Sequence, residues 1–125
     1  MIALDASAVL AFLFREEGHE IVAQSIERSC LSAVNLSEVL GRFARDGHDP
    51  KVVLDRIAAT SIEIVPFTES DALLAASLQP VTAPLGLSLG DRACLALASA
   101  RRITALTADR VWAQLDLSIG IELIR

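Results

Sequence analysis

The stretch LSLGDRACLALASARRITALTADRVW, residues 87–112, contains a helix start, an apolar strand and an acidic residue placed after that strand. Ser88 and Asp91 have the spacing of a capping box in its Asp variant, which predicts that a helix opens here. The apolar run 103–106 predicts a short buried strand, and Asp109 follows it by three residues. A helix that leads into a buried strand is a building unit of α/β proteins.

The other segments of the chain alternate in the same way. Strands are predicted at Ile2–Leu4, Cys30–Val34, Ile62–Val65, Ile103–Leu106 and Ile119–Ile124. Helices are predicted at Ala6–Arg15, near Ile21–Ile26, and at Asn35–Asp46, Pro50–Ile57, Glu69–Leu78, Ser88–Arg102 and Ala108–Leu115. Gln79–Gly86, which contains Pro80 and Pro84, is expected to be the one clear loop. This alternation predicts an α/β fold with a mostly parallel sheet.

Length and composition narrow the class of protein. A chain of 125 residues corresponds to one domain, 1–125, and 53% of it is hydrophobic. This apolar excess favours a sheet covered on both faces, or an oligomer interface. The longest uninterrupted apolar run near the N-terminus, Ala8–Phe14, is too short to span a membrane, so no membrane contact is expected. The two cysteines, Cys30 and Cys94, form no CxxC motif and indicate buried thiols in a reduced, cytoplasmic protein.

The net charge of −5 argues against general electrostatic binding of nucleic acid. It leaves open a nucleic-acid site in which a metal ion supplies the positive charge. Ten of the 11 basic residues are Arg, which binds phosphate through two parallel hydrogen bonds, so local Arg clusters still matter.

Four carboxylates stand out by their positions: Asp5, Glu38, Asp91 and Asp109. In parallel sheets, ligands bind beyond the carboxyl ends of the strands, and Asp5 and Asp109 follow predicted strands. If all four converge, they form an oxygen-only pocket whose repulsion a hard cation such as Mg²⁺ or Mn²⁺ would relieve. A metal held in this way can activate water and stabilise charge on a phosphodiester.

A simpler interpretation is that these carboxylates cap helices. All four fall at predicted helix N-termini, where acidic side chains are favoured by free backbone N–H groups and by the helix dipole. Asn35 and Glu38 match the capping-box spacing, as Ser88 and Asp91 do. For each residue taken singly, capping is the commoner use, so the residues alone favour capping and leave a metal site as a hypothesis.

Four sequence blocks resemble the motifs of PIN-domain ribonucleases of the VapC-like toxin group, from type II toxin–antitoxin systems. The blocks are IALDASAVL at 2–10, AVNLSEV at 33–39, LSLGDRACLALA at 87–98 and LTADRVW at 106–112. They occur in the family's order across nearly the whole chain, and the third and fourth are the most specific. The resemblance implies a PIN-like three-layer α/β/α fold with a mostly parallel sheet of four to five strands.

The resemblance also implies a function, that of a Mg²⁺-dependent endoribonuclease in which Mn²⁺ can substitute. Asp5, Asp91 and Asp109 match the family's metal-binding aspartates, and Glu38 matches its acidic helix partner, so these four residues are the expected catalytic and metal-binding set. Ser7 and Thr107 match supporting hydroxyl positions beside the site. The implied partners are an RNA substrate and a small antitoxin protein.

Several arginines lie near these motifs and could contact RNA phosphates. They are Arg42 and Arg45 beyond Glu38, Arg92 beside Asp91, and Arg110 beside Asp109. For each of them a solvated helix face is the simpler explanation. Trp112, the one Trp, has helical spacing with Leu115 and is interpreted as a core residue.

Other functions remain open at this stage. A phosphoacceptor domain with a nucleophilic Asp after its first strand needs a late Lys, and the one Lys here is Lys51, so this class is disfavoured. A non-catalytic module could use the acidic pocket to receive an Arg from a partner. An RNA-processing PIN nuclease that is not a toxin is a further alternative. The apolar excess suits an antitoxin interface or a homodimer.

Overall fold

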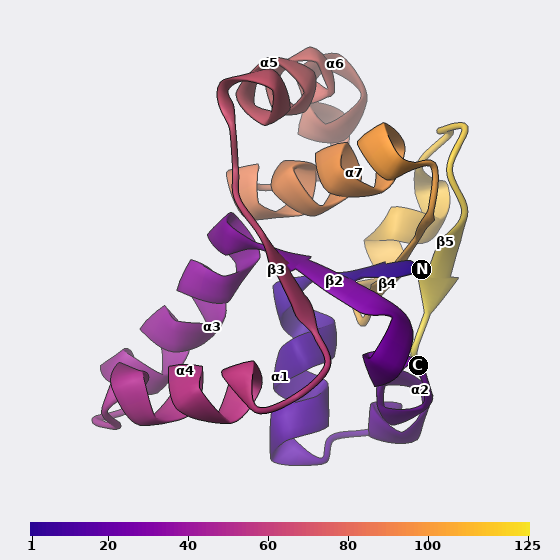
Figure 1. The fold of residues 1–125 in the computed structure, drawn as a ribbon. Helices are drawn as coiled ribbons and strands as arrows, with labels where there is room; N and C mark the ends of the chain where they lie inside the picture. The colour runs from indigo at the N-terminus through magenta and orange to yellow at the C-terminus, as the bar shows by residue number, and fades with distance from the viewer.

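Five parallel strands form one sheet in the order β3-β2-β1-β4-β5 in the computed structural model, which describes residues 1–125 (Figure 1). The strands are β1 (Ile2–Leu4), β2 (Ser29–Ser32), β3 (Glu63–Val65), β4 (Thr104–Thr107) and β5 (Ile121–Leu123). The predicted strands are therefore confirmed to within a few residues, and the sheet is parallel throughout. The strand order reverses between β1 and β4, the position where parallel sheets bind ligands.

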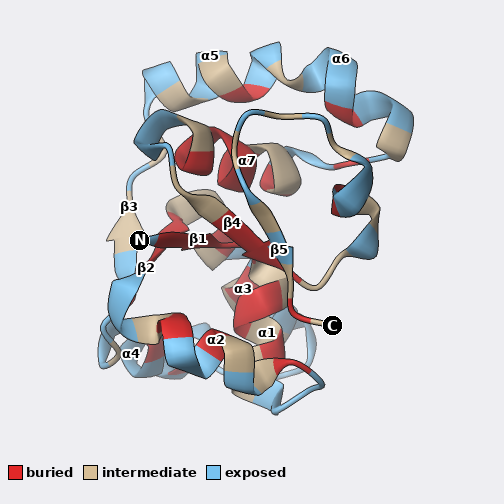
Figure 2. Cartoon of the chain, turned by 90° about the vertical axis from the view of Figure 1, so that its right-hand side faces the viewer, coloured by how far each residue is buried: buried red, intermediate tan, exposed pale blue.

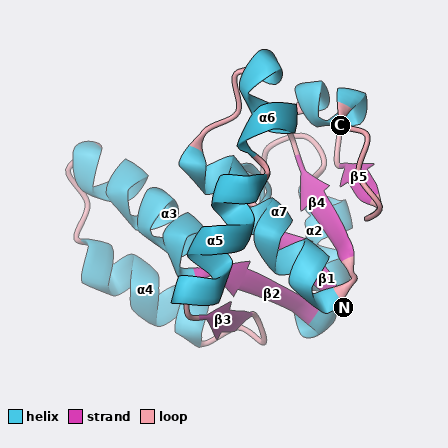
Figure 3. Ribbon diagram, turned by 90° about the horizontal axis from the view of Figure 1, so that it is seen from above, coloured by secondary structure: helices cyan, strands magenta, loops and turns pink.

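Seven α-helices cover the two faces of this sheet. They are α1 (Ala6–Phe14), α2 (His19–Ser25), α3 (Ala33–Arg45), α4 (Pro50–Ala58), α5 (Glu69–Ser77), α6 (Gln79–Thr82) and α7 (Leu89–Arg101). The short 3₁₀ helices are η1 (Ile26–Arg28), η2 (Ala83–Leu85) and η3 (Arg110–Gln114). Helices α1 to α4 lie on one face, and α7 lies on the other with α5 and α6 outside it (Figures 1 and 3). This arrangement is the expected three-layer α/β/α fold.

The three central strands, β1, β2 and β4, are buried on both faces, so each contributes alternate residues to two cores. Leu4, Leu31 and Leu106 pack against α1 to α4, whereas Ala3 and Cys30 face α7. Figure 2 shows the central strands and the inward sides of the helices as the buried part of the molecule. The second core also contains Cys94, Ala105 and Trp112, which confirms the interpretation of both cysteines and the Trp as buried residues.

The boundary between β2 and α3 differs from the prediction. The strand ends at Ser32, whose hydroxyl accepts a hydrogen bond from the Val34 N–H at 3.2 Å and so caps α3. Asn35 and Glu38 therefore lie inside the helix, and the predicted Asn35–Glu38 capping box is wrong. Ser32 takes the extended backbone conformation that an N-cap requires, which starts the helix two residues earlier than expected.

The predicted loop at Gln79–Gly86 is also wrong, because most of it is helical. It forms α6 and then η2, with a proline in the first turn of each. Proline fits there because its fixed φ is helical and its missing N–H has no acceptor in a first turn. Gly86 ends η2 in the left-handed conformation, at φ 71°. None of the helices has the length and apolar character that crossing a bilayer requires.

Candidate active site

Asp5 lies at the carboxyl end of β1 and is almost fully buried, at 3% exposure. Its Oδ1 accepts hydrogen bonds from the Ala8 N–H at 2.8 Å and from the Ser7 hydroxyl at 2.7 Å, so it is the N-cap of α1. Its Oδ2 accepts from the Thr107 hydroxyl at 2.5 Å and lies 2.9 Å from Ser7 Oγ. Residues at the ends of two neighbouring strands thus fix the orientation of one carboxylate.

Backbone groups after β4 in turn orient the two hydroxyls. The Ala108 N–H donates to Ser7 Oγ at 2.9 Å, and the Asp109 N–H donates to Thr107 Oγ1 at 3.0 Å. Each hydroxyl therefore accepts one backbone hydrogen bond and has its own proton available for Asp5. The network spans the point where the strand order reverses, and it positions Asp5 rigidly.

Burial raises the pKa of Asp5 to about 6, from an ordinary value of 3.8. The hydrogen bonds from Thr107, Ala8 and Ser7 act in the opposite direction, and repulsion from Asp91 adds to the rise. Asp5 forms no salt bridge with any Lys, Arg or His. The carboxylate is therefore buried without a counter-charge.

Glu38 approaches the same region from α3. The buried side chain of Asn35 donates through Nδ2 to Glu38 Oε1 at 2.9 Å and to the carbonyl oxygen of Gly90, also at 2.9 Å. Partial burial raises the pKa of Glu38, the Asn35 hydrogen bond lowers it, and the charge of Asp91 raises it further. Helix α3 is thus tied to the first turn of α7 beside a second carboxylate.

Asp91 completes a capping box at the start of α7, as the sequence predicts. Its Oδ2 accepts from the Ser88 N–H at 2.8 Å and the Ser88 hydroxyl at 3.1 Å, and Ser88 Oγ accepts from the Asp91 N–H at 3.3 Å. The charge of Asp91 also raises the pKa of both Asp5 and Glu38. Asp91 therefore combines a capping role with proximity to two other carboxylates.

Asp109 joins the network through its backbone, whereas its carboxylate caps η3. Its Oδ1 accepts from the Val111 N–H at 3.1 Å. The charge of Asp91 thus acts on both Asp5 and Glu38, whereas the Asp109 carboxylate is directed toward its own helical turn. No group of three or more acidic, His or Cys side chains is arranged to hold a metal ion. The donors are all oxygens, which suits Mg²⁺ or Mn²⁺, and Asp5 lacks a counter-charge that a cation could provide.

The predicted RNA-contacting arginines lie in different environments. Arg42 bonds Asp46 at 3.1 Å and lies over the Phe14 ring, 5.5 Å from its centroid, so it is engaged at the far end of α3. Arg92 donates to the Leu87 carbonyl at 3.3 Å, and its buried Nε has no partner. Arg110 is exposed beside Asp109 and has no ion pair.

Two residues of this region are not predicted by the sequence: Asn35 as a bridge, and Gly90 as its acceptor. The sequence favours a cap at Asn35, because Asn three residues before Glu is a frequent helix start. The signal available in the sequence is a polar Asn on the apolar side of a helix, next to the predicted acidic residue.

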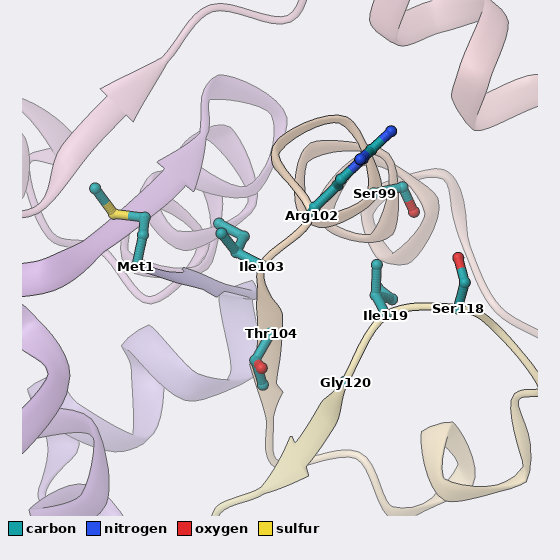
Figure 4. Close-up of a pocket in the computed structure, with 8 residues that line it drawn as sticks. All are labelled: Met1, Ser99, Arg102, Ile103, Thr104, Ser118, Ile119 and Gly120. Carbon is teal, nitrogen blue, oxygen red and sulfur yellow. The ribbon is translucent and has the colours of Figure 1, made fainter.

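None of the three hollows of the surface contains these carboxylates. The largest, of about 670 Å³, lies at the amino ends of the strands, opposite the carboxylates. It is lined by residues such as Ser99, Arg102, Thr104 and Ser118 (Figure 4). The other two lie along α3 and α4. Of the four carboxylate residues, Asp5 is buried, Asp91 and Asp109 are half-buried and Glu38 is exposed.

The strands are parallel, and carboxylates lie at the point between β1 and β4 where the strand order reverses. These two features place the chain among α/β proteins with an acidic site. The family model of the PIN domain matches residues 2–117, and the chain belongs to this family.

Solved structures of toxin–antitoxin proteins have the same fold. A toxin–antitoxin complex from Klebsiella pneumoniae superposes with a TM-score of 0.77 at 15% identity, covering 100% of this chain and 98% of that one. VapC20 of Mycobacterium tuberculosis, a toxin that cleaves the sarcin–ricin loop, has a TM-score of 0.76 at 19% identity, covering 96% and 99%. DNA-bound VapBC from Salmonella typhimurium has a TM-score of 0.74 at 20% identity, covering 99% and 98%. None of the curated proteins compared with the chain matches it.

Proposed function

We propose that this PIN-domain protein is a metal-dependent endoribonuclease and the toxin of a toxin–antitoxin pair. The observation that carries the proposal is Asp5, a buried carboxylate without a counter-charge, held in place by Ser7 and Thr107 and close enough to Asp91 for their charges to repel. The described activity of VapC20 supports RNA as the substrate class. The Klebsiella and Salmonella complexes support an antitoxin as the partner.

The four acidic residues have distinct parts in this proposal. Asp5, Asp91 and Asp109, assisted by Glu38, would hold Mg²⁺ or Mn²⁺. Bound there, a divalent cation supplies Lewis acidity and activates water for hydrolysis of a phosphodiester. Ser7 and Thr107 hold the Asp5 oxygens in a fixed direction, which avoids reorganisation during the reaction.

Glu38 is exposed and Asp91 and Asp109 are half-buried, so a polymer could reach these three carboxylates from outside. Arg92 and Arg110 stand next to Asp91 and Asp109 in the sequence, and we propose that they bind RNA phosphates. Arg42, engaged by Asp46, belongs to the same proposal only if that ion pair opens when RNA binds.

Exposed apolar side chains support a protein partner. Leu73 is 75% exposed, and Leu89 and Val52 are also largely exposed. An apolar hollow of about 350 Å³ lies along α3 and reaches Pro50 at the start of α4. We propose that a small antitoxin, or a second copy of this chain, covers one or more of these apolar regions in the cytoplasm. Light scattering of the purified chain distinguishes a monomer from a homodimer.

The first experiment separates metal binding from helix capping. Asp71 forms a capping box with Thr68 on α5, with hydrogen bonds of 2.8, 3.0 and 3.3 Å, nearly the same as those of Asp91 with Ser88. Asp71→Asn is thus a matched control for Asp91→Asn. Both variants should lose similar stability, whereas calorimetry should show Mn²⁺ affinity falling more than about tenfold only in Asp91→Asn. Equal Mn²⁺ binding by both would leave Asp91 as a cap alone.

The second experiment tests the reaction and its biological use. Wild type should cleave a pool of fluorescent oligoribonucleotides in Mn²⁺ and arrest growth when expressed, and Asp5→Asn should do neither. Cleavage without growth arrest would favour an RNA-processing nuclease. A wild type that binds no Mn²⁺ would favour a non-catalytic, partner-binding module.

A further inference from the structure

Asn35 makes a bridge that joins two elements distant in the sequence. Its Nδ2 has two protons, and its two partners, Glu38 Oε1 and the Gly90 carbonyl oxygen 55 residues away, are both acceptors. The orientation of the amide is therefore fixed by its chemistry, because the reversed amide would present an oxygen to two oxygens.

Stability alone does not explain an Asn at this position. Its Oδ1 is buried and has no hydrogen-bond partner. A buried acceptor without a donor destabilises a folded protein, and an apolar side chain of similar size would avoid that cost. Asn35 instead supplies two donors, one of which is directed at an acidic residue of the candidate site.

Gly90 shows that the fit between Glu38 and α7 is close. A Cβ atom on Gly90 would overlap Oε1 and Cδ of Glu38 and lie 2.7 Å from Oε2. The Glu38 carboxylate thus rests directly on the backbone of α7, one residue before Asp91. Any larger side chain at position 90 would displace the carboxylate.

We propose that Asn35 is a positioning residue that, together with the space left at Gly90, holds Glu38 beside Asp91, where both carboxylates would take part in binding the metal. This inference rests on the proposed function, and it deepens it by naming the residues that set the site's shape. Asn35 touches neither metal nor RNA in this scheme and acts through Glu38. Outer-shell partners of this kind typically contribute 10- to 100-fold to metal affinity or activity.

Nuclear magnetic resonance tests the bridge without any metal or RNA. Because both Nδ2 protons are donated, the side-chain amide of Asn35 should exchange slowly with solvent in wild type. Glu38→Ala should shift one of its two proton resonances and speed its exchange. Rapid exchange in wild type, or resonances unchanged by Glu38→Ala, would overturn the bridge.

Mn²⁺ calorimetry tests the positioning role. Asn35→Leu and Gly90→Ala should each lower Mn²⁺ affinity by about 10- to 100-fold, the first by releasing Glu38 and the second by displacing it. Gly41→Ala is the control, since Gly41 is also a helical glycine and a Cβ there meets nothing within 4 Å. It should leave Mn²⁺ affinity unchanged.

Double variants distinguish positioning from a general structural role. In a Glu38→Ala background, Asn35→Leu and Gly90→Ala should cause no further loss of Mn²⁺ affinity, because the residue they act through is gone. A further loss of the same size in that background would overturn the role of Asn35.

The two proposals fail in different ways. A wild type that binds Mn²⁺, with Asn35→Leu and Gly90→Ala binding it equally well, would overturn only the positioning role. A wild type that binds no Mn²⁺ would overturn the proposed function and, with it, the role assigned to Asn35. Gly90→Ala adds one methyl group in the first turn of α7, where it meets the end of the Glu38 side chain, which can move aside. This variant should therefore fold, and it tests the positioning role even if Asn35→Leu does not fold.

Discussion

At the scale of single residues, Asp5 shows how one side chain can serve the fold and yet reduce its stability. Its carboxylate caps α1, a stabilising use, but it is buried without a cationic partner. The pKa of Asp5 is about 6 in the folded chain and 3.8 as its ordinary value. In the metal-free protein, Asp5 therefore contributes most to the free energy of unfolding when it is protonated.

The sign of the resulting pH dependence follows from linkage. Because the folded chain has the higher pKa, the contribution of Asp5 to stability is complete below pH 3.8 and is lost as the pH rises through about 6. The difference between these values corresponds to about 3 kcal/mol. Asp5→Asn should thus stabilise the protein at pH 8 in EDTA, and should change little at pH 4. The gain should be about 1–2 kcal/mol, since the Asn amide cannot accept the Thr107 proton that Asp5 accepts.

Urea denaturation of wild type and Asp5→Asn at both pH values measures this difference. The Asn side chain keeps the N-cap of α1, so helix capping is not lost. A variant less stable than wild type at pH 8 would contradict the burial argument. Saturating Mn²⁺ should reverse the order at pH 8, because only wild type gains stability from binding it.

The sequence predicts the residues whose position along the chain determines their use, and not those whose use depends on a distant contact. Asp5 follows an apolar run and Asp91 follows a capping serine, so local patterns indicate both. Asn35 and Gly90 meet across 55 residues, and the one local sign that Asn35 is not a cap is its place on the apolar side of a helix. The length of the Glu38 side chain and the absence of a Cβ at Gly90 have meaning only after α3 and α7 are packed.

At the scale of elements, local signals locate most of the helices and strands. They are misleading where two signals compete, as at the start of α3, where Ser32 and Asn35 are both good N-caps and the earlier one is used. They are also misleading at Gln79–Gly86, where prolines suggest a loop but occupy first turns of helices. The backbone conformation at each position decides which signal applies.

The same substitution should have opposite effects in two elements for this reason. Gly41 lies inside α3 with open space where a methyl group would project, so Gly41→Ala should stabilise the protein by up to about 1 kcal/mol through helix propensity. Gly86 also has open space, but its φ is 71°, so Gly86→Ala should destabilise the protein by about 1–2 kcal/mol. Urea denaturation of the two variants checks both signs. Equal effects would contradict the assigned backbone conformations.

At the scale of the whole molecule, the alternation of helices and strands predicts a parallel sheet, but not its order. Strands of three or four residues contain too little pattern to specify their neighbours. The order β3-β2-β1-β4-β5 makes β1 and β4 neighbours, which brings Asp5 and Thr107 together. Acidic residues thus lie near the carboxyl ends of the strands, in a chain whose net charge is −5.

This charge distribution predicts how RNA cleavage should depend on salt. With few arginines near the site, RNA binding should release few counterions, and the slope of log(kcat/KM) against log[KCl] should be about −1.4 to −2 for two or three phosphate contacts. Arg110→Gln should make the slope shallower by about 0.7, because one contact is removed. Arg28→Gln is a suitable control, since Arg28 is an exposed arginine in η1, before the amino end of β2 and away from the carboxyl ends of the strands. It should leave the slope unchanged.

Initial rates at low RNA concentration and constant Mn²⁺ measure all three slopes. A much steeper slope, or one that Arg110→Gln leaves unaltered, would show that RNA is bound on a basic surface away from the carboxylates.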